Sequence, residues 1–276
     1  MKAFGVNFCL PFLTREDKFM AKQVLITGAS SGIGQACALE SVRQGYQVHL
    51  VARRWDYLKA VQAACDQVFP GSAFIYQIDL ADMAKTDQAL SDLLAKHQID
   101  ILVNCAGIGL AKPLLETSYE EIVKLFQVNV LALAYLSKRL ASHMLVKGSG
   151  HIVNIGSLAG KVPTASTSIY SATKAAVISL SDALRLELKD YGVYVTSVNL
   201  GPVDTDFFEK AGVSSSYLAK LSSLTLDPDQ VAKRIVKIYM KPKRQVNLPI
   251  IMSLGVKLHN LFPSLSEAFI YTFFKK

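Results

Sequence analysis

The chain has 276 residues, of which 51% are hydrophobic and 19% charged, with 30 Lys and Arg against 22 Asp and Glu. This composition lacks the bias of disordered chains and supplies enough apolar side chains for a deep core. The basic residues are scattered and form no block with interleaved aromatics, which argues against nucleic-acid binding. The net charge of +8 weakly favours anionic ligands or an anionic membrane face.

The four cysteines, Cys9, Cys37, Cys65 and Cys105, are far apart, with no Cys-x-x-Cys and no nearby pair of histidines. This spacing predicts neither a zinc site nor a disulfide framework, so we expect no metal. Separate thiols are typical of a reducing compartment, and we expect a cytoplasmic protein. No continuous apolar run approaches the ~20 residues needed to span a bilayer.

The first residues combine Lys2 with an apolar stretch, which resembles the start of a signal peptide. Asn7 and Pro11 interrupt that stretch, and no small-residue cleavage site follows it. We therefore interpret residues 1–19 as an N-terminal extension, which can be disordered, and expect the folded domain to begin at residue 20.

Apolar runs alternate with helical patterns from residue 20 to residue 250. The predicted strands are 23–28, 46–52, 73–78, 99–104, 151–157, 193–199 and 245–250. The predicted helices are 33–44, 55–69, 83–97, 119–147, 168–191 and 228–240. Alternation without hairpin signals predicts an α/β fold, a single doubly wound domain with about seven parallel strands and helices on both faces. No linker or internal repeat divides it.

A glycine-rich turn at residues 27–34 (TGASSGIG) joins the first predicted strand to the first predicted helix. A helix N-terminus offers unpaired N–H groups and a positive dipole end to a pyrophosphate, and glycines let the backbone approach the phosphates. The spacing differs from the commoner Gly-x-Gly-x-x-Gly, and an isolated match can be a plain tight connection. Its place between strand and helix favours a dinucleotide site. The cofactor-binding residues expected here are Gly28, Ser30, Ser31, Gly32, Ile33 and Gly34.

The end of the second predicted strand indicates which dinucleotide binds. Sites for NAD usually place an acid there for the ribose hydroxyls, whereas sites for NADP offer a cation to the 2′-phosphate. This chain has Arg53 and Arg54 and no acid. A guanidinium can grip a phosphate through two hydrogen bonds, although both arginines could be ordinary solvated loop residues. The pattern favours NADP(H).

Tyr170 and Lys174 lie four residues apart in a helical pattern, so their side chains share one face. A free tyrosine has a pKa near ~10 and is a poor base at neutral pH. We expect the neighbouring ammonium to lower the pKa of Tyr170, which would make the phenol a general acid and base. Ser157, at the end of the fifth predicted strand, could form a hydrogen bond to the substrate oxygen that exchanges a proton with Tyr170. Tyr-x-x-x-Lys alone is common, and its weight here comes from its position after Ser157 and the dinucleotide turn.

These ordered motifs resemble the short-chain dehydrogenase/reductase family over residues 23–206, with the last strand included. The resemblance implies a Rossmann-type NADP-binding catalytic domain at 20–250. It implies that Asn129 holds a water of the proton relay and completes a catalytic tetrad with Ser157, Tyr170 and Lys174. It also implies that Lys174 binds the nicotinamide ribose. The other residues that the resemblance assigns to the cofactor are Asp79, Leu80, Asn104, Ala106, Gly107, Val203 and Thr205.

Two positions depart from the family pattern. Cys105 stands where the family has a second asparagine, which puts one support of the sheet in doubt. Leu200 stands where proline is usual in the loop that meets the nicotinamide, so the stiffness of that loop is in doubt, whereas its threonine, Thr205, is kept. Asp204 and Asp206 in this loop are expected to cap a helix that begins near Phe207.

The tail at 251–276 is rich in apolar residues and is interrupted by a few polar ones and Pro263. We expect it to pack over the substrate pocket or a partner subunit. The alternative is peripheral contact with a membrane surface, which the aromatic-rich end and Lys275-Lys276 support. The resemblance also implies assembly as a homodimer or homotetramer.

Segments 108–114, 158–167 and 207–224 are expected to form the substrate pocket. They mix Leu, Phe, Val and Ala with Ser and Thr, which favours a bulky apolar ketone or a 3-oxoacyl compound. We therefore expect an NADP(H)-dependent carbonyl reductase or alcohol dehydrogenase. The alternative is a non-enzymatic NADP-sensing binding protein with a relic active site, against which the intact tetrad argues.

Overall fold

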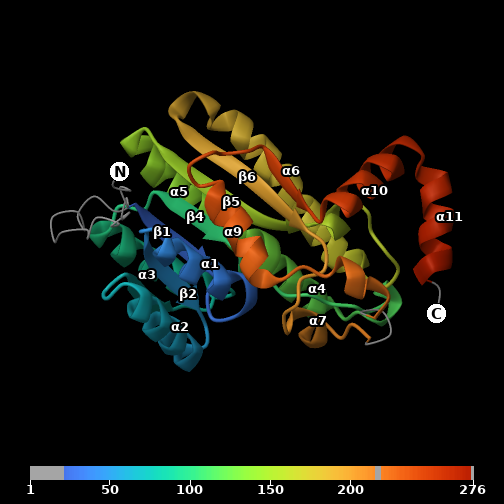
Figure 1. Cartoon of the computed structure of the whole chain (residues 1–276), viewed down its shortest axis with the longest axis horizontal. Helices are drawn as coiled ribbons and strands as arrows, with labels where there is room; N and C mark the ends of the chain where they lie inside the picture. The colour runs from blue at the N-terminus through green and yellow to red at the C-terminus, as the bar shows by residue number, and fades with distance from the viewer. Residues whose placement is uncertain (1–21, 215–218, 275–276) are drawn as a thin grey trace, which may run out of the picture.

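The computed structural model describes residues 22–214 and 219–274. The expected N-terminal extension at 1–19 lies outside the described residues. Within them, seven parallel strands form one sheet in the order β3-β2-β1-β4-β5-β6-β7 (Figure 1). The strands are β1 (Gln23–Thr27), β2 (Gln47–Ala52), β3 (Ala73–Gln77), β4 (Ile101–Asn104), β5 (Gly150–Ser157), β6 (Val193–Leu200) and β7 (Gln245–Leu248). Each predicted strand is present, and the doubly wound parallel sheet is confirmed.

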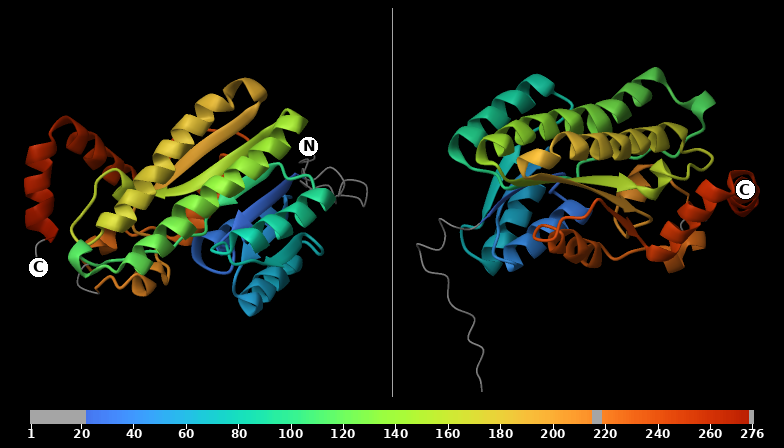
Figure 2. Two further views of the ribbon diagram at one scale, coloured as in Figure 1. Left: turned by 180° about the vertical axis from the view of Figure 1, so that it is seen from behind. Right: turned by 90° about the horizontal axis from the view of Figure 1, so that it is seen from above.

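Helices cover both faces of the sheet (Figure 2). On one face lie α1 (Gly32–Arg43), α2 (Trp55–Val68) and α9 (Pro228–Lys237). On the other lie α3 (Met83–Lys96), α5 (Ala132–Lys147) and α6 (Ser168–Glu187). The remaining helices are α4 (Tyr119–Phe126), α7 (Phe207–Lys210), α10 (Ile250–Leu261) and α11 (Pro263–Phe274). Short 3-10 turns occur at Leu114–Glu116, Leu158–Gly160, Lys189–Tyr191 and Ser222–Leu224.

Each face of the sheet has its own apolar core. Under α1, α2 and α9, buried side chains such as Cys37, Leu58 and Ile235 pack on Val24 and Ile26 of β1. On the opposite face, residues of α3, α5 and α6 pack on the alternate positions of the strands, which include Leu25, Leu102 and Ile152. Because both faces are covered, the strands are almost continuously apolar, as parallel strands usually are.

The strand order reverses between β1 and β4. β2 and β3 follow β1 toward one edge of the sheet, whereas β4 to β7 extend from its other side. Connections on the two sides of this switch point leave in opposite directions, which opens a crevice at the carboxyl ends of the strands. The glycine-rich turn after β1 lies at this point.

The predicted helix at 119–147 is interrupted by a π-turn. α4 ends at Phe126, the π-turn η3 covers Gln127–Leu131, and α5 continues from Ala132. Such single π-turns inside α-helices are frequent at functional sites. Here the turn contains Asn129, which is 1% exposed.

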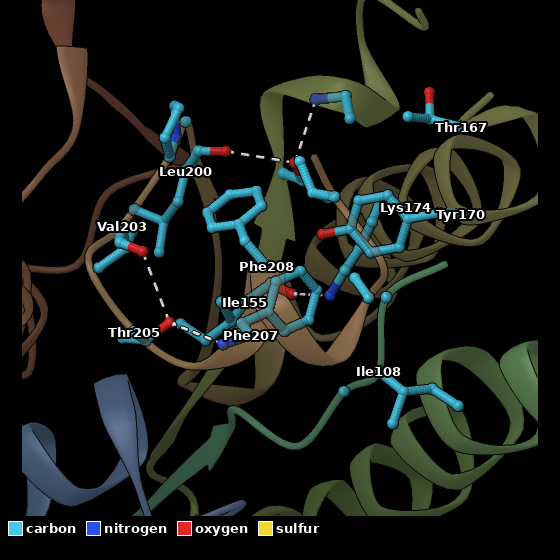
Figure 3. A pocket seen from close by; sticks show the side chains of 18 of the residues that line it. Ile108, Ile155, Thr167, Tyr170, Lys174, Leu200, Val203, Thr205, Phe207 and Phe208 are labelled. Atoms are coloured by element: carbon cyan, nitrogen blue, oxygen red, sulfur yellow. Dashed lines mark hydrogen bonds between the residues drawn. The ribbon is translucent and has the colours of Figure 1, made fainter. Parts of the chain in front are cut away.

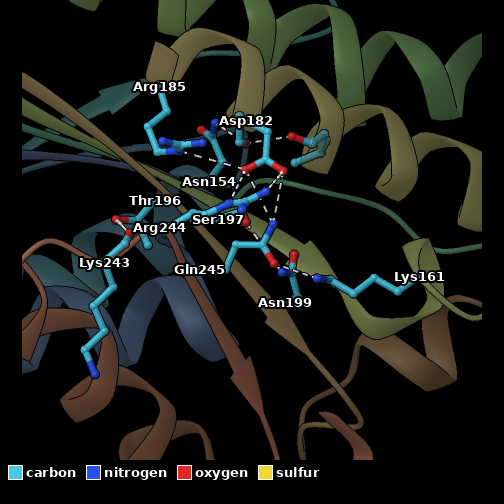
Figure 4. Close-up of polar contacts among 12 residues, drawn as sticks. Asn154, Lys161, Asp182, Arg185, Thr196, Ser197, Asn199, Lys243, Arg244 and Gln245 are labelled. Carbon is cyan, nitrogen blue, oxygen red and sulfur yellow. Dashed lines mark hydrogen bonds and ion pairs between the residues drawn. The ribbon is translucent and has the colours of Figure 1, made fainter. Parts of the chain in front are cut away.

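The last strand is fastened to α6 by a polar cluster around Asp182 (Figure 4). The carboxylate of Asp182 accepts hydrogen bonds from Arg244 at 3.0 Å and from Gln245 at 3.2 Å. Lys161 in turn donates to the side-chain oxygen of Gln245 at 2.6 Å. These contacts hold the pKa of Asp182 below its usual range, chiefly through the bond from Arg244. The cluster thereby ties the loop after β5 to the strand from which the tail departs.

The tail forms a helical hairpin that projects from the body at the carboxyl end of the sheet (Figures 1 and 2). α10 begins two residues after β7, and α11 packs against α10. His259 and Ser266, joined by a hydrogen bond of 2.8 Å, hold the two helices together. In the described part of the chain, no helix has the length and apolar character needed to cross a bilayer.

Candidate active site

A cleft of about 2630 Å³ runs along the carboxyl ends of the strands. It begins at the glycine-rich turn after β1, passes the ends of β4, β5 and β6, and ends against α7 and α10. Pockets for one small ligand usually measure ~300–1,000 Å³. The cleft therefore has room for a dinucleotide and a sizeable second molecule.

The glycines of the turn allow close approach of two backbone segments. Gly28 has φ of +67°, and a Cβ there would come within 2.8 Å of the Ala106 backbone. A Cβ on Gly34 would overlap the carbonyl oxygen of Gly28. Only glycine avoids both conflicts, so the start of α1 can lie directly over the end of β1.

The N-terminus of α1 is open to an anion. Ser31 occupies the N-cap position in extended conformation, but its side chain makes no capping hydrogen bond to the helix. The first N–H groups of α1 are thus not satisfied by the cap and face the cleft that Gly32, Ile33 and Gly34 line. This cradle fits the pyrophosphate of a dinucleotide.

The two predicted arginines lie at the same end of the cleft in different surroundings. Arg54 donates hydrogen bonds to Ser30 at 3.0 Å and to Ser31 at 2.7 Å, and its guanidinium lies 4.3 Å from the centre of the Tyr57 ring. Arg53 is more exposed and lies 3.9 Å from the carboxylate of Asp79. Both line the cleft, as do Asp79 and Leu80. The arginines therefore provide a basic end to the cleft, with Arg54 already held in place.

The loop after β4 is pinned to the glycine-rich turn through backbone groups. The hydroxyl of Thr27 accepts hydrogen bonds from the N–H groups of Cys105 and Ala106, each at 3.1 Å. Because the backbone of Cys105 makes this contact, it does not require an asparagine side chain at that position. Ala106 and Gly107 line the cleft beside the turn.

Asn104 lies behind the cleft rather than in its wall. Its side-chain amide donates hydrogen bonds to Ser137 at 3.1 Å and to Asn154 at 2.9 Å, and Asn154 donates to Ser181 at 2.9 Å. All four residues are buried. This network joins β4 and β5 to α5 and α6, so Asn104 acts as a support of the sheet.

Tyr170 and Lys174 lie side by side in the cleft (Figure 3), and Ser157 lines the same cleft. Ser157 ends β5, and its hydroxyl donates to the carbonyl oxygen of Leu200 at 3.2 Å and accepts from the N–H of Ala159 at 3.1 Å. Tyr170 and Lys174 come from the first turns of α6, with the ammonium 5.9 Å from the phenol ring centre. Lys174 donates to the carbonyl oxygen of Ile155 at 2.9 Å.

The direction of the Tyr170 pKa differs from the prediction. Burial raises the pKa of Tyr170 to about 12, and a hydrogen bond with Ser157 opposes this increase. Burial also lowers the pKa of Lys174 to about 8. Desolvation outweighs the attraction between phenolate and ammonium because both groups lie in the same enclosed region and Lys174 is turned toward Ile155. The phenol thus keeps its proton at neutral pH, which suits a proton donor.

The side chain of Asn129 is occupied by protein partners. Its amide donates to the carbonyl oxygen of Ile108 at 2.9 Å and to the hydroxyl of Thr173 at 3.1 Å, and it accepts from the N–H of Ile108 at 2.8 Å. Asn129 therefore joins the π-turn, the loop after β4 and α6 directly behind Lys174. Its expected role as holder of a relay water stays a prediction.

The loop after β6 closes the cleft opposite Tyr170 and Lys174 (Figure 3). Val203 and Thr205 line it, and the hydroxyl of Thr205 accepts from the N–H of Phe207 at 3.4 Å. Leu200 ends β6 in register with Leu248, and its carbonyl oxygen accepts a hydrogen bond from the hydroxyl of Ser157. The strand pairing therefore fixes the start of the loop without a proline at position 200.

The prediction that Asp206 caps the helix at Phe207 was right in position, but the Asp206 side chain makes no capping hydrogen bond. Asp206 holds the N-cap position of α7 and pairs with Lys210 at 2.8 Å instead. Because α7 has only four residues, Lys210 at its end lies close to the N-cap residue Asp206. The ammonium of Lys210 therefore competes with the backbone N–H groups for the carboxylate of Asp206.

The remaining part of the cleft is mainly apolar. Residues from all three predicted segments line it, with Phe207 5.8 Å from the ring of Tyr170 and Phe208 beside it. A further wall comes from α10, through Met252, Val256 and other residues. The tail was expected to pack over the substrate pocket or a partner subunit, or to contact a membrane surface, and α10 lies against the cleft. The helical spacing of Met252, Val256 and His259, which places them on one side of a helix, was the available signal for this wall.

The fold and the geometry of the cleft together define a dinucleotide-binding protein with a tyrosine, a serine and a lysine beside the nucleotide. The family model for short chain dehydrogenase matches residues 22–214. The chain belongs to the short-chain dehydrogenase/reductase family, a family of oxidoreductases.

The relatives span most of the chain. A dehydrogenase/reductase SDR family protein 7-like from Drosophila melanogaster is 32% identical over 90% of this chain and 79% of that protein. The 3-ketodihydrosphingosine reductase of Bos taurus is 31% identical over 78% of this chain and 67% of that protein. Among solved structures, a short-chain dehydrogenase from Sphingobium yanoikuyae in complex with NADPH has a TM-score of 0.79 and 30% identity. That similarity covers 89% of this chain and 95% of the other.

Proposed function

We propose that the protein is an NADP(H)-dependent carbonyl reductase or alcohol dehydrogenase in which Tyr170 is the general acid and base. The observation that carries the proposal is the convergence of Tyr170, Ser157 and Lys174 beside a cradle that fits a dinucleotide. A bound reduced nicotinamide would supply the hydride for the carbonyl carbon. The substrate class that the apolar cleft favours is a bulky ketone or a 3-oxoacyl compound.

The roles of the three side chains follow from their protonation and contacts. Tyr170, whose pKa lies well above neutral pH, would donate its proton to the substrate oxygen during reduction and recover it from water. Ser157 contacts Tyr170 and would bond the same oxygen, which orients the carbonyl. Lys174, charged below about pH 8, would favour the negative charge that develops at the phenol.

The coenzyme preference rests on the arginines. The two residues directly after β2 are Arg53 and Arg54 and not an acid, and both line the end of the cleft. Two related structures were solved with NADPH or NADP⁺, which agrees with this preference. The tetrad role of Asn129 and assembly as a homodimer or homotetramer belong to the same proposal as expectations from the family. A cytoplasmic location belongs to it as an expectation from the separate cysteines.

A panel of ketones, 3-oxoacyl thioesters and secondary alcohols, assayed with NADPH and NADH, tests the proposal. We expect oxidation of NADPH with apolar carbonyl compounds, at a higher kcat/KM than with NADH. Tight NADPH binding without turnover of any compound would instead favour the sensor alternative. Failure to bind either coenzyme would contradict both.

A further inference from the structure

The outer side of α10 exposes large apolar side chains. Ile251, Leu254 and Leu261 are 66%, 55% and 70% exposed. Exposed side chains on this helix and the start of α11 also include Ile250, Leu258, Phe262 and Leu265. A cluster of this kind on one surface normally marks a site that contacts another apolar phase or molecule.

The inner side of the same helix lines the cleft. Met252, Val256 and His259 face it, and Leu258, Phe262 and Leu265 belong both to its lining and to the exposed cluster. The apolar surface therefore continues from the outside of the hairpin into the substrate part of the cleft. At Leu258, Phe262 and Leu265 the surface that leads from the outer cluster into the cleft is apolar, whereas the neighbouring Ser266 and Glu267 add polar groups to the lining.

The arrangement of α10 favours a broad apolar phase over a second helix. At ~100° per residue, positions 250, 251, 254, 258 and 261 spread over roughly 100°, wider than the narrow seam of a helix pair. Ser253, Lys257 and Asn260 gather on a single narrow side next to this arc. A lysine at the edge of an apolar face is typical of helices that lie in a membrane interface.

The charge of the hairpin points to an anionic surface. From residue 250 to residue 276 three lysines, Lys257, Lys275 and Lys276, stand against a single acid, Glu267. The sequence of α11 ends in Phe-Ile-Tyr-Thr-Phe-Phe, and tyrosine and phenylalanine beside lysines are frequent at the level of lipid headgroups. The net charge of +8 acts in the same direction.

We propose that the α10–α11 hairpin lies on an anionic membrane surface and that the cleft receives a long-chain, lipid-like ketone directly from the lipid layer. The entrance is the apolar surface at Leu258, Phe262 and Leu265. This inference rests on the proposed reductase function. In the reaction, a bound NADPH would supply the hydride for the carbonyl carbon, and Tyr170 would donate the proton to the oxygen and recover it from water, so that the ketone becomes a secondary alcohol.

Vesicle co-sedimentation of the full chain tests the surface. The vesicles are made of phosphatidylcholine alone or with one third phosphatidylglycerol. The test variant carries Ile251→Ser, Leu254→Ser and Leu261→Ser, three exposed residues outside the lining of the cleft. The control removes three exposed apolar side chains elsewhere, through Leu115→Ser, Val146→Ser and Leu186→Ser.

We expect the wild type and the control to bind the anionic vesicles more tightly than the neutral ones. The test variant should bind the anionic vesicles at least about tenfold more weakly, because three large apolar side chains no longer enter the lipid. Absence of wild-type binding, or equal binding by the test variant, would overturn the membrane assignment. The assignment would also be overturned if the wild type did not bind vesicles but formed a dimer, and the test variant lost that dimer. A second copy of the chain would then cover the hairpin.

Turnover of a long-chain ketone embedded in the anionic vesicles tests the delivery of substrate. The test variant should reduce it at least about tenfold more slowly than the control, while a short water-soluble ketone is reduced equally by both. Equal rates on the embedded ketone would refute delivery through the hairpin. Absence of NADPH oxidation with both ketones would refute the reductase function instead, and vesicle binding would still decide the surface.

Discussion

Replacement of Arg54 by alanine is expected to separate the two coenzymes. Arg54 is partly enclosed, and its hydrogen bonds to Ser30 and Ser31 hold the guanidinium at the end of the cleft. A hydrogen bond to a charged group contributes ~1.5–3 kcal/mol, and its loss corresponds to an increase in Kd of roughly 10- to 150-fold. We expect this increase for NADPH, whereas the Kd of NADH, which lacks the 2′-phosphate, should change less than about threefold.

Replacement of Arg53 provides an internal comparison. The side chain of Arg53 is 57% exposed and pairs with Asp79 at 3.9 Å, so solvent screens its charge. Arg53→Ala should therefore weaken NADPH by only about two- to fivefold, again more than NADH. Arg54→Lys, which keeps the charge but not the planar fork, should fall between wild type and Arg54→Ala.

Calorimetric titration with both coenzymes measures these effects. The single tryptophan, Trp55, follows Arg54 directly and gives a second, fluorescent readout. Raising the salt concentration should narrow the difference between NADPH and NADH in the wild type, because screening weakens the arginine contacts. Equal weakening of both coenzymes by Arg53→Ala and Arg54→Ala would refute the assignment of the arginines to the 2′-phosphate.

Three further substitutions test other parts of the account. Burial lowers the pKa of Lys174 to about 8, so kcat/KM for NADPH should fall as the pH rises through about 8. Lys174→Arg should move that fall to higher pH, and an unchanged pH profile would argue against a role for the positive charge of Lys174. Gly34→Ala would place a Cβ against the carbonyl oxygen of Gly28, so NADPH binding should weaken at least about tenfold. An unchanged Kd of NADPH in calorimetry would contradict this expectation. Burial lowers the pKa of His49 to about 3, below its unfolded value of ~6.5. The unfolded state then binds more protons between these pH values, and stability should decrease by up to ~1.4 kcal/mol per pH unit as the pH falls. Denaturant unfolding at pH 7 and pH 4 should show a smaller decrease for His49→Gln, and an equal decrease would count against this reasoning.

The fold was readily predicted because periodicity and turn residues agree along the chain. β1 has an apolar centre at Val24–Ile26 and is followed by Gly28, and α9 begins with Pro228 directly after a capping aspartate, Asp227. Such local signals determine each element independently of the rest. The π-turn at Asn129 carries no comparable signal, since its residues continue the helical pattern on both sides.

The candidate site was predicted where a motif fixes the position of a residue along the chain. Ser157 and Tyr170 were identified from their places after a strand and at the start of a helix, and both line the cleft. Asn104 was assigned to the cofactor, yet it lies in the buried network behind the cleft, because a motif does not state which way a side chain points. The direction of the Tyr170 pKa depends on burial by distant segments, which spacing along one helix does not reveal.

The contribution of α10 to the cleft was the largest structural addition. The sequence indicates an apolar tail, but the contact of Met252 and Val256 with the cleft depends on how the chain leaves β7. The bonds that Asp182 makes to Arg244 and Gln245 fix that departure, and they join residues 62 and 63 positions apart. Pairings over such separations are set by the sheet, not by any local pattern.

Steady-state turnover and NADPH binding of Tyr170→Phe test the central claim most directly, with Tyr194→Phe as a control on an exposed tyrosine of β6. Loss of the phenolic proton should reduce kcat about 10²- to 10⁴-fold, while the Kd of NADPH stays within about twofold of the wild type and the control remains fully active. Retention of more than about a tenth of the wild-type kcat by Tyr170→Phe would contradict the assignment of Tyr170 as the proton donor.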